Sequence, residues 1–310
     1  MNAQVNQGRR ALFSMMNKSY NLSLPPDIQI KLFDQLVLPI LLYGCEIWGF
    51  QNFNQIEVFH TKFCKRILKL SKYTPNCMVY GELGRHKIIK SVELRMVLFW
   101  WAIAASRGHN LAHLIYKFLR TMHETDVYSS PWIVKVKGIL DKSGLSFVWN
   151  NTCEVSSNWL RIILKQRLDD MYEQDWIAEV NASSQCRNYR IFKTRLVLEP
   201  YLLKSDPFAR NIFCKFRCGN SKLPVVVGKF EGIDYSERLC QFCNSESLGD
   251  EFHYIFQCCC FTKERNLLLK SYFRRRPSVI KMKELFETQN RKTLANLIRF
   301  CKIIMDKFLR

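Results

Sequence analysis

Four residues in the last quarter of the sequence, Cys240, Cys243, His253 and Cys258, follow the spacing C-x2-C-x9-H-x4-C. Three thiolates and one imidazole form a soft donor set that Zn²⁺ accepts in a closed tetrahedron. A tight turn between the first two cysteines aims both sulfur atoms at one point about 2.3 Å away, and the polar segment Asn244–Gly249 returns the chain. The pattern therefore predicts one structural zinc ion that stabilises a small domain.

The second half of this pattern constrains the local backbone. Asp250 and Glu251 suit the positive N-terminal end of a short helix, which places His253 in its first turn. Cys258 follows five residues later and lies about 140° further around an ideal α-helix. Both residues can bind one metal only if the helix tightens or ends between them.

Two alternatives to this ligand set stay open at the level of sequence. Cys259 and Cys260 adjoin Cys258, and either could replace it as the fourth ligand. The competing hypothesis is that these thiols are ordinary core residues, a role that cysteine often has.

The bulk composition is that of a folded chain. At 310 residues and 48% hydrophobic content, the chain can bury one large core or two smaller ones. The residues after Met1 are polar and lack the apolar stretch of a signal peptide, and the longest apolar runs fall short of the ~20 residues of a membrane span. An odd number of cysteines, 13, fits a reducing compartment. We expect an intracellular protein of the nucleus or cytoplasm, with no membrane partner.

The net charge of +20 is concentrated in two blocks. Residues 60–107 include ten basic and two acidic side chains, and residues 262–310 include fourteen basic and four acidic ones. Residues 231–261, around the Cys/His pattern, carry a net charge of −5. Clustered basic charge is typical of proteins that bind a polyphosphate, because binding releases the counterions condensed on it. We expect RNA, DNA or both as partners, and the alternative is a merely solvated basic surface.

Ten basic side chains are the candidates for phosphate contact, because they lie on the polar face of a predicted helix or in basic clusters. They are Lys62, Lys65, Arg66, Lys69, Arg187, Arg190, Lys193, Arg274, Arg275 and Arg276. Phe242 or Tyr254 could stack on an unpaired base, although both could instead pack the zinc domain.

Apolar periodicity predicts a mainly α fold. Helices are expected over residues 56–70, capped by Asn54, over 88–106, with the apolar run 97–105 deeply buried, and over 111–122, capped by Asn110. A long helix over 159–180 is expected after a cap at Ser157 or Asn158. The best strand candidate is Pro224–Gly228.

Turn-forming residues suggest three regions along the chain. Residues 1–125 form a helical, bundle-like part, and residues 126–186 form a linker that contains the long helix. Residues 187–310 comprise a basic linker, the zinc domain and a basic helical tail.

The sequence offers little for catalysis. His109 and His113 lack a third ligand, and Asp169-Asp170 lies in a helical pattern without the strand-turn-strand setting of two-metal chemistry. Phosphate-loop, dinucleotide and serine-hydrolase motifs do not occur in the printed sequence. Cys214 and Cys218 are candidate accessory metal ligands, and core thiols are the competing hypothesis. We expect no enzymatic activity from this chain alone.

Several separate strings, in order along nearly the whole chain, carry a resemblance to a known family. They are Leu38–Gly49, Phe63–Leu68, Val79–Gly84, Tyr189–Lys193, Leu198–Leu202, Lys222–Pro224, Leu239–Cys243 and Gly249–Tyr254. Together they resemble the region that follows the polymerase core in reverse transcriptases of LINE-type (non-LTR) retrotransposons.

The resemblance implies a thumb-like helical region, a linker and a C-terminal CCHC zinc knuckle that hold template RNA and target DNA during target-primed reverse transcription. It assigns the zinc ligands to Cys240, Cys243, His253 and Cys258, although Cys259 stands where the family commonly has proline. The family's polymerase aspartates and endonuclease signatures are not recognisable in this sequence. The resemblance therefore implies a non-catalytic, nucleic-acid-binding fragment. The alternative is a structural or interaction fragment that folds only against a reverse-transcriptase core, in trans or in a parent polyprotein.

Overall fold

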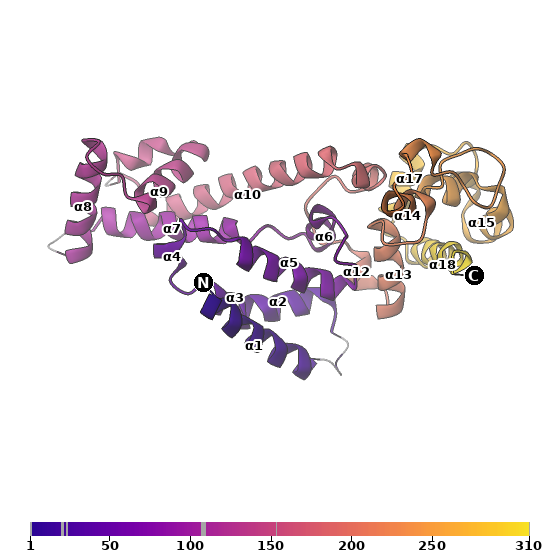
Figure 1. The fold of residues 1–310 in the computed structure, drawn as a ribbon, viewed down its shortest axis with the longest axis horizontal. Coiled ribbons are helices and arrows are strands. Elements are labelled where there is room, and N and C mark those ends of the chain that lie inside the picture. Colours follow the sequence, from indigo (N-terminus) through magenta and orange to yellow (C-terminus); the bar gives the residue numbers. More distant parts are fainter. Residues whose placement is uncertain (1, 20–21, 23, 107–109, 153, 310) are drawn as a thin grey trace. The chain divides into compact units, whose positions relative to one another are not determined.

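The computed structural model describes residues 2–19, 22, 24–106, 110–152 and 154–309, and it is mainly α, as the sequence predicts (Figure 1). In this described part, β pairing is limited to a single antiparallel bridge between Leu239 and Leu248. His109, one of the two histidines considered above, lies outside the described residues.

The chain divides into two compact units, each built from separate stretches of sequence. Unit 1 comprises residues 1–18, 32–60 and 86–175, and unit 2 comprises residues 19–31, 61–85 and 176–310. Three of the five divisions fall in the interior of helices, namely α2 (Pro26–Leu36), α5 (Asn54–Leu68) and α10 (Ser157–Ala182). The three consecutive regions predicted from the sequence stay a prediction.

The core of unit 1 forms around helix α7 (Ile89–Ala104). The Trp100 ring stacks on Trp149, with ring centroids 5.1 Å apart and planes 4° apart. Gly49 permits a close approach to α7, because a Cβ there would lie 2.5 Å from the Met96 sulfur and 2.8 Å from Val92. The other elements of unit 1 are α1 (Asn2–Ser19), α3 (Leu38–Leu41), α4 (Cys45–Trp48), α8 (Leu111–Glu124), α9 (Pro131–Lys142) and the 3₁₀ turn η2 (Ser146–Trp149).

Unit 2 packs short helices around an aromatic core. The Phe192 and Phe286 rings stack at 4.4 Å, and helix α13 packs along helix α18. Its elements are α6 (Asn76–Leu83), η3 (Ser184–Cys186), α11 (Tyr189–Phe192), α12 (Tyr201–Lys204), α13 (Pro207–Arg217), α14 (Pro224–Phe230), η4 (Tyr235–Glu237), η5 (His253–Gln257), η6 (Cys259–Phe261), α15 (Thr262–Leu268), α16 (Ser271–Arg274), α17 (Val279–Phe286) and α18 (Arg291–Lys307).

The predicted strand at Pro224–Gly228 is wrong, because these residues begin helix α14. Proline fixes φ near the helical value and lacks an N–H, so it fits the first position of a helix. Pro224 is buried, and a Cβ added at Gly249 would lie 2.6 Å from its ring. Local proline chemistry and this close contact outweigh the β preference of the three consecutive valines.

The helix caps agree with the sequence in one case and differ in two. The Asn110 side chain caps α8 by accepting from the Ala112 N–H, as predicted. Asn54 instead begins α5 itself, and the Asn52 side chain accepts from its N–H. The predicted Ser157 and Asn158 both lie inside α10, where the Ser156 hydroxyl accepts from the Trp159 N–H.

The predicted burial of residues 97–105 is only partly right. Val97 and Trp100 are fully buried, whereas Phe99 is 36% exposed and Ala102 is exposed. One face of α7 meets the core, so an apolar surface all round does not guarantee burial all round.

Candidate metal centre

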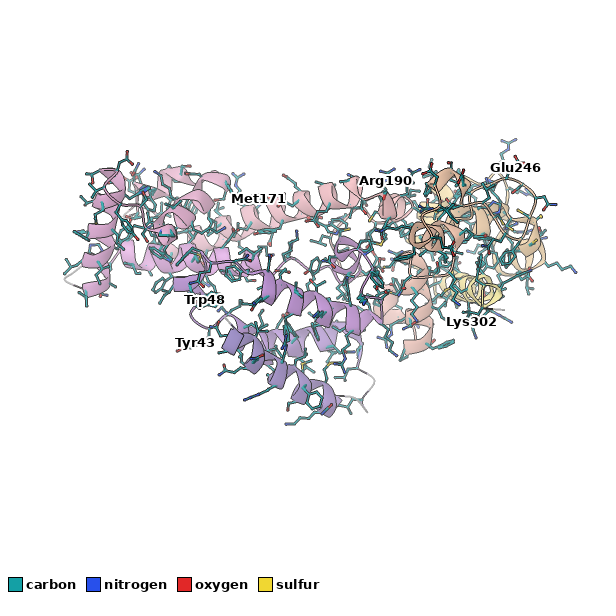
Figure 2. All side chains as sticks on the ribbon, in the orientation of Figure 1. Tyr43, Trp48, Met171, Arg190, Glu246 and Lys302 are labelled. Atoms are coloured by element: carbon teal, nitrogen blue, oxygen red, sulfur yellow. The ribbon has the colours of Figure 1, made fainter. Side chains whose placement is uncertain are left out.

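A short turn presents the first two cysteines of the Cys/His pattern. The bridge between Leu239 and Leu248 is closed by the Cys240 N–H, which donates to the Ser247 carbonyl at 2.9 Å, and by the Gly249 N–H, which donates to the Arg238 carbonyl at 2.8 Å. The chain reverses in the exposed loop around Glu246, labelled in Figure 2, which has a left-handed φ of 49°. The turn therefore presents the thiols of Cys240 and Cys243 on the same side of the loop.

Within the turn, sulfur also accepts a backbone hydrogen bond. The Phe242 N–H points at the Cys240 Sγ, 3.4 Å away. This contact helps to fix the position of the sulfur within the turn.

A capped helix presents the other two residues. The Asp250 side chain accepts from the His253 N–H at 2.8 Å, so His253 lies in the first turn, as predicted. Residues His253–Gln257 form a π-helix, and Cys258 leaves it with φ −55° and ψ 121°. The helix therefore ends between the two candidate ligands, as their spacing requires, but it widens rather than tightens.

A buried arginine satisfies the carbonyl groups at the end of this π-helix. Arg265 is 7% exposed, and its guanidinium donates to the carbonyls of Ile255 at 2.7 Å and Cys258 at 2.7 Å. It also donates to the Tyr254 carbonyl at 3.3 Å. The carbonyl groups at a helix end have no intrahelical partner, so this contact holds the wide turn in place. Sequence reasoning missed Arg265, since only its charge was visible.

The four side chains converge on one point. Their ligand atoms all lie within 4.8 Å of one another. The sulfurs of Cys240 and Cys258 are 3.8 Å apart, and the Cys243 sulfur is 3.3 Å from the His253 Nε2. With bonds of about 2.3 Å to sulfur and 2.0 Å to nitrogen, the edges of a zinc tetrahedron are about 3.8 and 3.5 Å. The cluster therefore has the size and the donor set of a metal site.

The fourth ligand position belongs to Cys258 rather than to its neighbours. Cys258 is fully buried at the cluster, whereas Cys259 and Cys260 are exposed and do not belong to it. The Cys260 thiol instead donates to the Phe242 carbonyl at 2.5 Å.

The electrostatics of the cluster favour a bound cation. Burial raises the pKa of the Cys258 thiol, so its thiolate needs a compensating positive charge. The Ser245 hydroxyl, 3.0 Å from the Cys243 sulfur, lowers the pKa of that thiol to about 6. The His253 Nε2 faces the cluster, and its Nδ1 is buried without a hydrogen-bond partner among the described residues. Thiolates and a neutral imidazole are the protonation states that a metal ion requires.

Aromatic side chains form a small core beside the cluster. Tyr254 is fully buried, and Phe242 is half-buried, with its ring centroid 4.7 Å from that of Phe308 and 6.0 Å from that of Phe261. Both predicted base-stacking residues therefore pack the candidate metal domain.

Cys214 and Cys218 form a second cluster together with Glu82, and all three are buried. The Glu82 carboxylate already accepts from two nitrogens of the buried Arg217 at 3.0–3.2 Å and from the Tyr201 hydroxyl at 2.5 Å. Burial also raises the pKa of Cys218 well above its ordinary value. Because the Glu82 oxygens are already engaged by Arg217 and Tyr201, the arrangement favours core thiols over metal ligands.

Most of the basic candidates are exposed, but one is buried. Lys193 is 3% exposed, and its Nζ lies 2.5 Å from Glu199 and 2.6 Å from the Val197 carbonyl. A buried and paired ammonium cannot reach a phosphate, so its assignment to phosphate contact is wrong. All ten predicted candidates belong to unit 2, which also holds the metal cluster.

The other nine candidates fall into two groups. Lys65 and Arg274 are half-buried, with Lys65 donating to the Lys72 carbonyl at 2.8 Å and Arg274 donating to the Asn266 side chain at 2.5 Å. The exposed candidates are Lys62, Arg66, Lys69, Arg187, Arg190 (labelled in Figure 2), Arg275 and Arg276.

Asp169 and Asp170 lie within helix α10, as expected from their helical pattern. Asp169 forms an ion pair with Lys90. This arrangement agrees with the rejection of the pair as a two-metal site.

None of the described helices combines the length and the apolar character that crossing a lipid bilayer requires. Comparisons with known protein families, with curated proteins and with solved structures give no match to this chain.

Proposed function

We propose that this chain is a zinc-stabilised, non-catalytic module that binds nucleic acid. The observation that carries the proposal is the presence of the CCHC cluster and the exposed basic candidates in the same compact unit. The resemblance to the region after the polymerase core of LINE-type reverse transcriptases supports the same function. By that resemblance, the module contacts RNA and DNA during target-primed reverse transcription.

Zinc is the metal that best fits the donor set. Three sulfurs and one nitrogen within 4.8 Å of one another favour Zn²⁺ over the oxygen-preferring Mg²⁺ and Ca²⁺. Four protein ligands close the coordination sphere, which is typical of a structural rather than a catalytic zinc. In this proposal the ion fixes the turn Cys240–Cys243 against the helix that begins after Asp250.

The basic surface supplies the affinity. Each lysine or arginine that contacts a phosphate releases condensed counterions, so binding weakens as salt increases. A chain with a net charge of +20 and exposed candidates such as Arg190 and Arg275 fits this mode of binding.

Filter binding of the zinc-loaded chain to a structured RNA across a salt series tests the proposal. The expected plot of log affinity against log salt is steep, with a slope of about −0.7 to −0.9 per phosphate contacted. A slope near zero, or no binding at low salt, would contradict nucleic-acid binding. Addition of Mg²⁺ and nucleotides tests for polymerase activity, and we expect no incorporation.

The second candidate function is that of an interaction fragment that packs against a reverse-transcriptase core. Tyr43 and Ile47, which lie in the strings that carry the resemblance, are 79% and 63% exposed. Leu36 nearby is 51% exposed. Sedimentation and thermal unfolding of the isolated chain separate the two functions, because a soluble, monomeric and cooperatively folded chain would argue against an obligatory core.

A further inference from the structure

Unit 2 contains a cleft between helices α13 and α18 that none of the sequence motifs indicated. It has a volume of about 420 Å³. It is lined by Lys204, which lies shortly before α13, by the start of α13 and by the first three turns of α18. The two helices lie side by side (Figure 1). Lys302, labelled in Figure 2, belongs to its rim.

The rim of the cleft is strongly basic. Its cations are Lys204, Arg291, Arg299 and Lys302, and all four are exposed. The one acidic lining residue is Asp206, whose carboxylate accepts from the backbone N–H groups of Phe208 and Ala209 at 3.0 Å as the cap of α13. Four cations around one capping carboxylate attract a polyanion.

An exposed aromatic ring lies within this basic rim. Phe208 is 63% exposed, and the Lys302 Nζ lies 5.0 Å from the centre of its ring. The capped first turn of α13 holds the Phe208 backbone in place. An aromatic face beside cations provides a stacking surface for a nucleic-acid base.

The floor of the cleft is apolar. It is formed by Ile212 of α13 and by Leu294 and Ile298 of α18, the last two of which are nearly fully buried. An apolar floor can contact the flat face of a base, but it offers a phosphate neither a charge nor a hydrogen-bond donor. In a duplex the base faces are covered by stacking, so only an unpaired strand can use both the floor and the rim.

We propose that the cleft between α13 and α18 binds a single strand of RNA or DNA. One base stacks on Phe208, and the flanking phosphates contact Arg299, Lys302, Arg291 and Lys204. This inference rests on the proposed nucleic-acid binding and adds the form of the nucleic acid and the place where it binds.

The test uses fluorescence anisotropy of the full, zinc-loaded chain with a labelled oligouridylate and with a duplex of the same length. Phe208→Ala removes the stacking ring, and Phe208→Tyr retains it. Arg299→Gln/Lys302→Gln removes two rim cations. Arg161→Gln/Lys165→Gln is its charge-matched control, because both residues are exposed on α10 and lie outside the cleft. Circular dichroism and zinc content verify the fold of each variant.

We expect Phe208→Ala to weaken single-strand binding about 5- to 150-fold while duplex binding changes by about twofold or less. Phe208→Tyr should bind like the wild type. Arg299→Gln/Lys302→Gln should reduce the salt slope for the single strand by about 1.4, and the α10 control should leave it unchanged.

If the wild type binds and both cleft variants bind the single strand equally well, the cleft is not the binding site. The proposed nucleic-acid binding by the chain would still stand. Equal competition by polyglutamate and by oligouridylate, with no effect of Phe208→Ala, would indicate an acidic peptide and would also overturn the proposal. If the wild type bound neither single strand nor duplex, the proposed function would itself fail.

Discussion

The backbone N–H of Cys258 donates to the carbonyl of His253 at a distance of 2.8 Å. This hydrogen bond spans five residues and closes one wide π turn, whereas an α-helix closes over four. Cys258 leaves the helix with a ψ of 121°, and its sulfur lies 3.8 Å from the Cys240 sulfur. The x4 spacing between histidine and cysteine is therefore compatible with one metal ion because the helix is widened and then ends.

This geometry predicts different roles for adjacent cysteines. Cys258→Ser should reduce bound zinc from about one per chain to near zero, because a hydroxyl replaces a buried thiolate ligand. Cys260→Ser should retain the ion, since the Cys260 thiol contacts the Phe242 carbonyl outside the cluster. Native mass spectrometry measures both contents directly. Loss of zinc from Cys260→Ser with retention in Cys258→Ser would reverse the assignment.

Removal of a bound metal should destabilise residues 238–258 and leave unit 1 unchanged. Backbone pairing in residues 239–248 is limited to a single β-bridge, so beside the packing of Phe242 a bound ion would supply much of the order of this segment. Chelation should therefore increase hydrogen exchange over residues 238–258, while the α7 core around the stacked Trp100 and Trp149 exchanges as before. Mass spectrometry of peptic fragments, before and after chelation, makes the comparison. Zinc added back should restore the protection.

The CCHC cluster could be predicted from the sequence because its chemistry is local. All four ligands lie within nineteen residues, from Cys240 to Cys258, and few other ions accept three sulfurs and a nitrogen. The helix start at Asp250 and Glu251 could also be predicted, and in the structure the Asp250 side chain caps this helix. The role of Arg265 could not be predicted, because it depends on hydrogen bonds to backbone carbonyl groups that come within reach only after folding.

The burial of Lys193 and the positions of the unit divisions both depend on tertiary packing. Lys193 has the same sequence signature as the exposed Arg190, and only the tertiary contact with Glu199 distinguishes them. Three of the five divisions between the two units fall in the interior of the continuous helices α2, α5 and α10, where no glycine or proline marks them in the sequence. Burial is set by packing between distant segments, and periodicity along one helix does not contain that information.

The buried ion pair between Arg217 and Glu82 should contribute strongly to the integrity of unit 2. Both side chains are fully buried, and Arg217 also lies 3.0 Å from Glu199. Arg217→Met should cost about 3–5 kcal/mol of unfolding free energy, because it leaves the buried Glu82 carboxylate without its cation. Urea unfolding followed by circular dichroism measures the change.

The matched control is the pair between Arg120 and Glu124, which lies on the surface of α8 and leaves Glu124 51% exposed. Glu124→Gln should cost less than about 1 kcal/mol, because an exposed ion pair is screened by water. Equal costs for the two variants would show that burial does not control the strength of these pairs.

The same cluster predicts a dependence of stability on pH. Burial raises the pKa of Glu199, even with Arg217 and Lys193 as neighbours. The folded chain therefore holds this proton more tightly than the unfolded chain does, and the contribution of Glu199 to stability falls as pH rises from the ordinary glutamate range to the raised pKa. Glu199→Gln removes this component, by at most about 1.4 kcal/mol per pH unit. Urea unfolding at several pH values should give a flatter profile for Glu199→Gln and an unaltered one for Glu124→Gln.

Lys193 and Arg190 should separate stability from binding. Lys193→Met leaves Glu199 short of one buried partner at 2.5 Å, so it should cost about 3 kcal/mol or more of unfolding free energy. It should not alter the salt slope of RNA binding in the folded chain, because its ammonium does not reach solvent.

The exposed cations should behave in the opposite way. Arg190→Gln/Arg275→Gln removes two exposed charges, so it should change stability by about 0.5 kcal/mol or less and reduce the salt slope by about 1.4–1.8. The two measurements, urea unfolding and salt-dependent filter binding, are made on the same protein preparations. If Lys193→Met reduced the slope while the double variant did not, exposure would be the wrong criterion for phosphate contact. The basic residues that carry the binding would then have to be sought elsewhere on the chain.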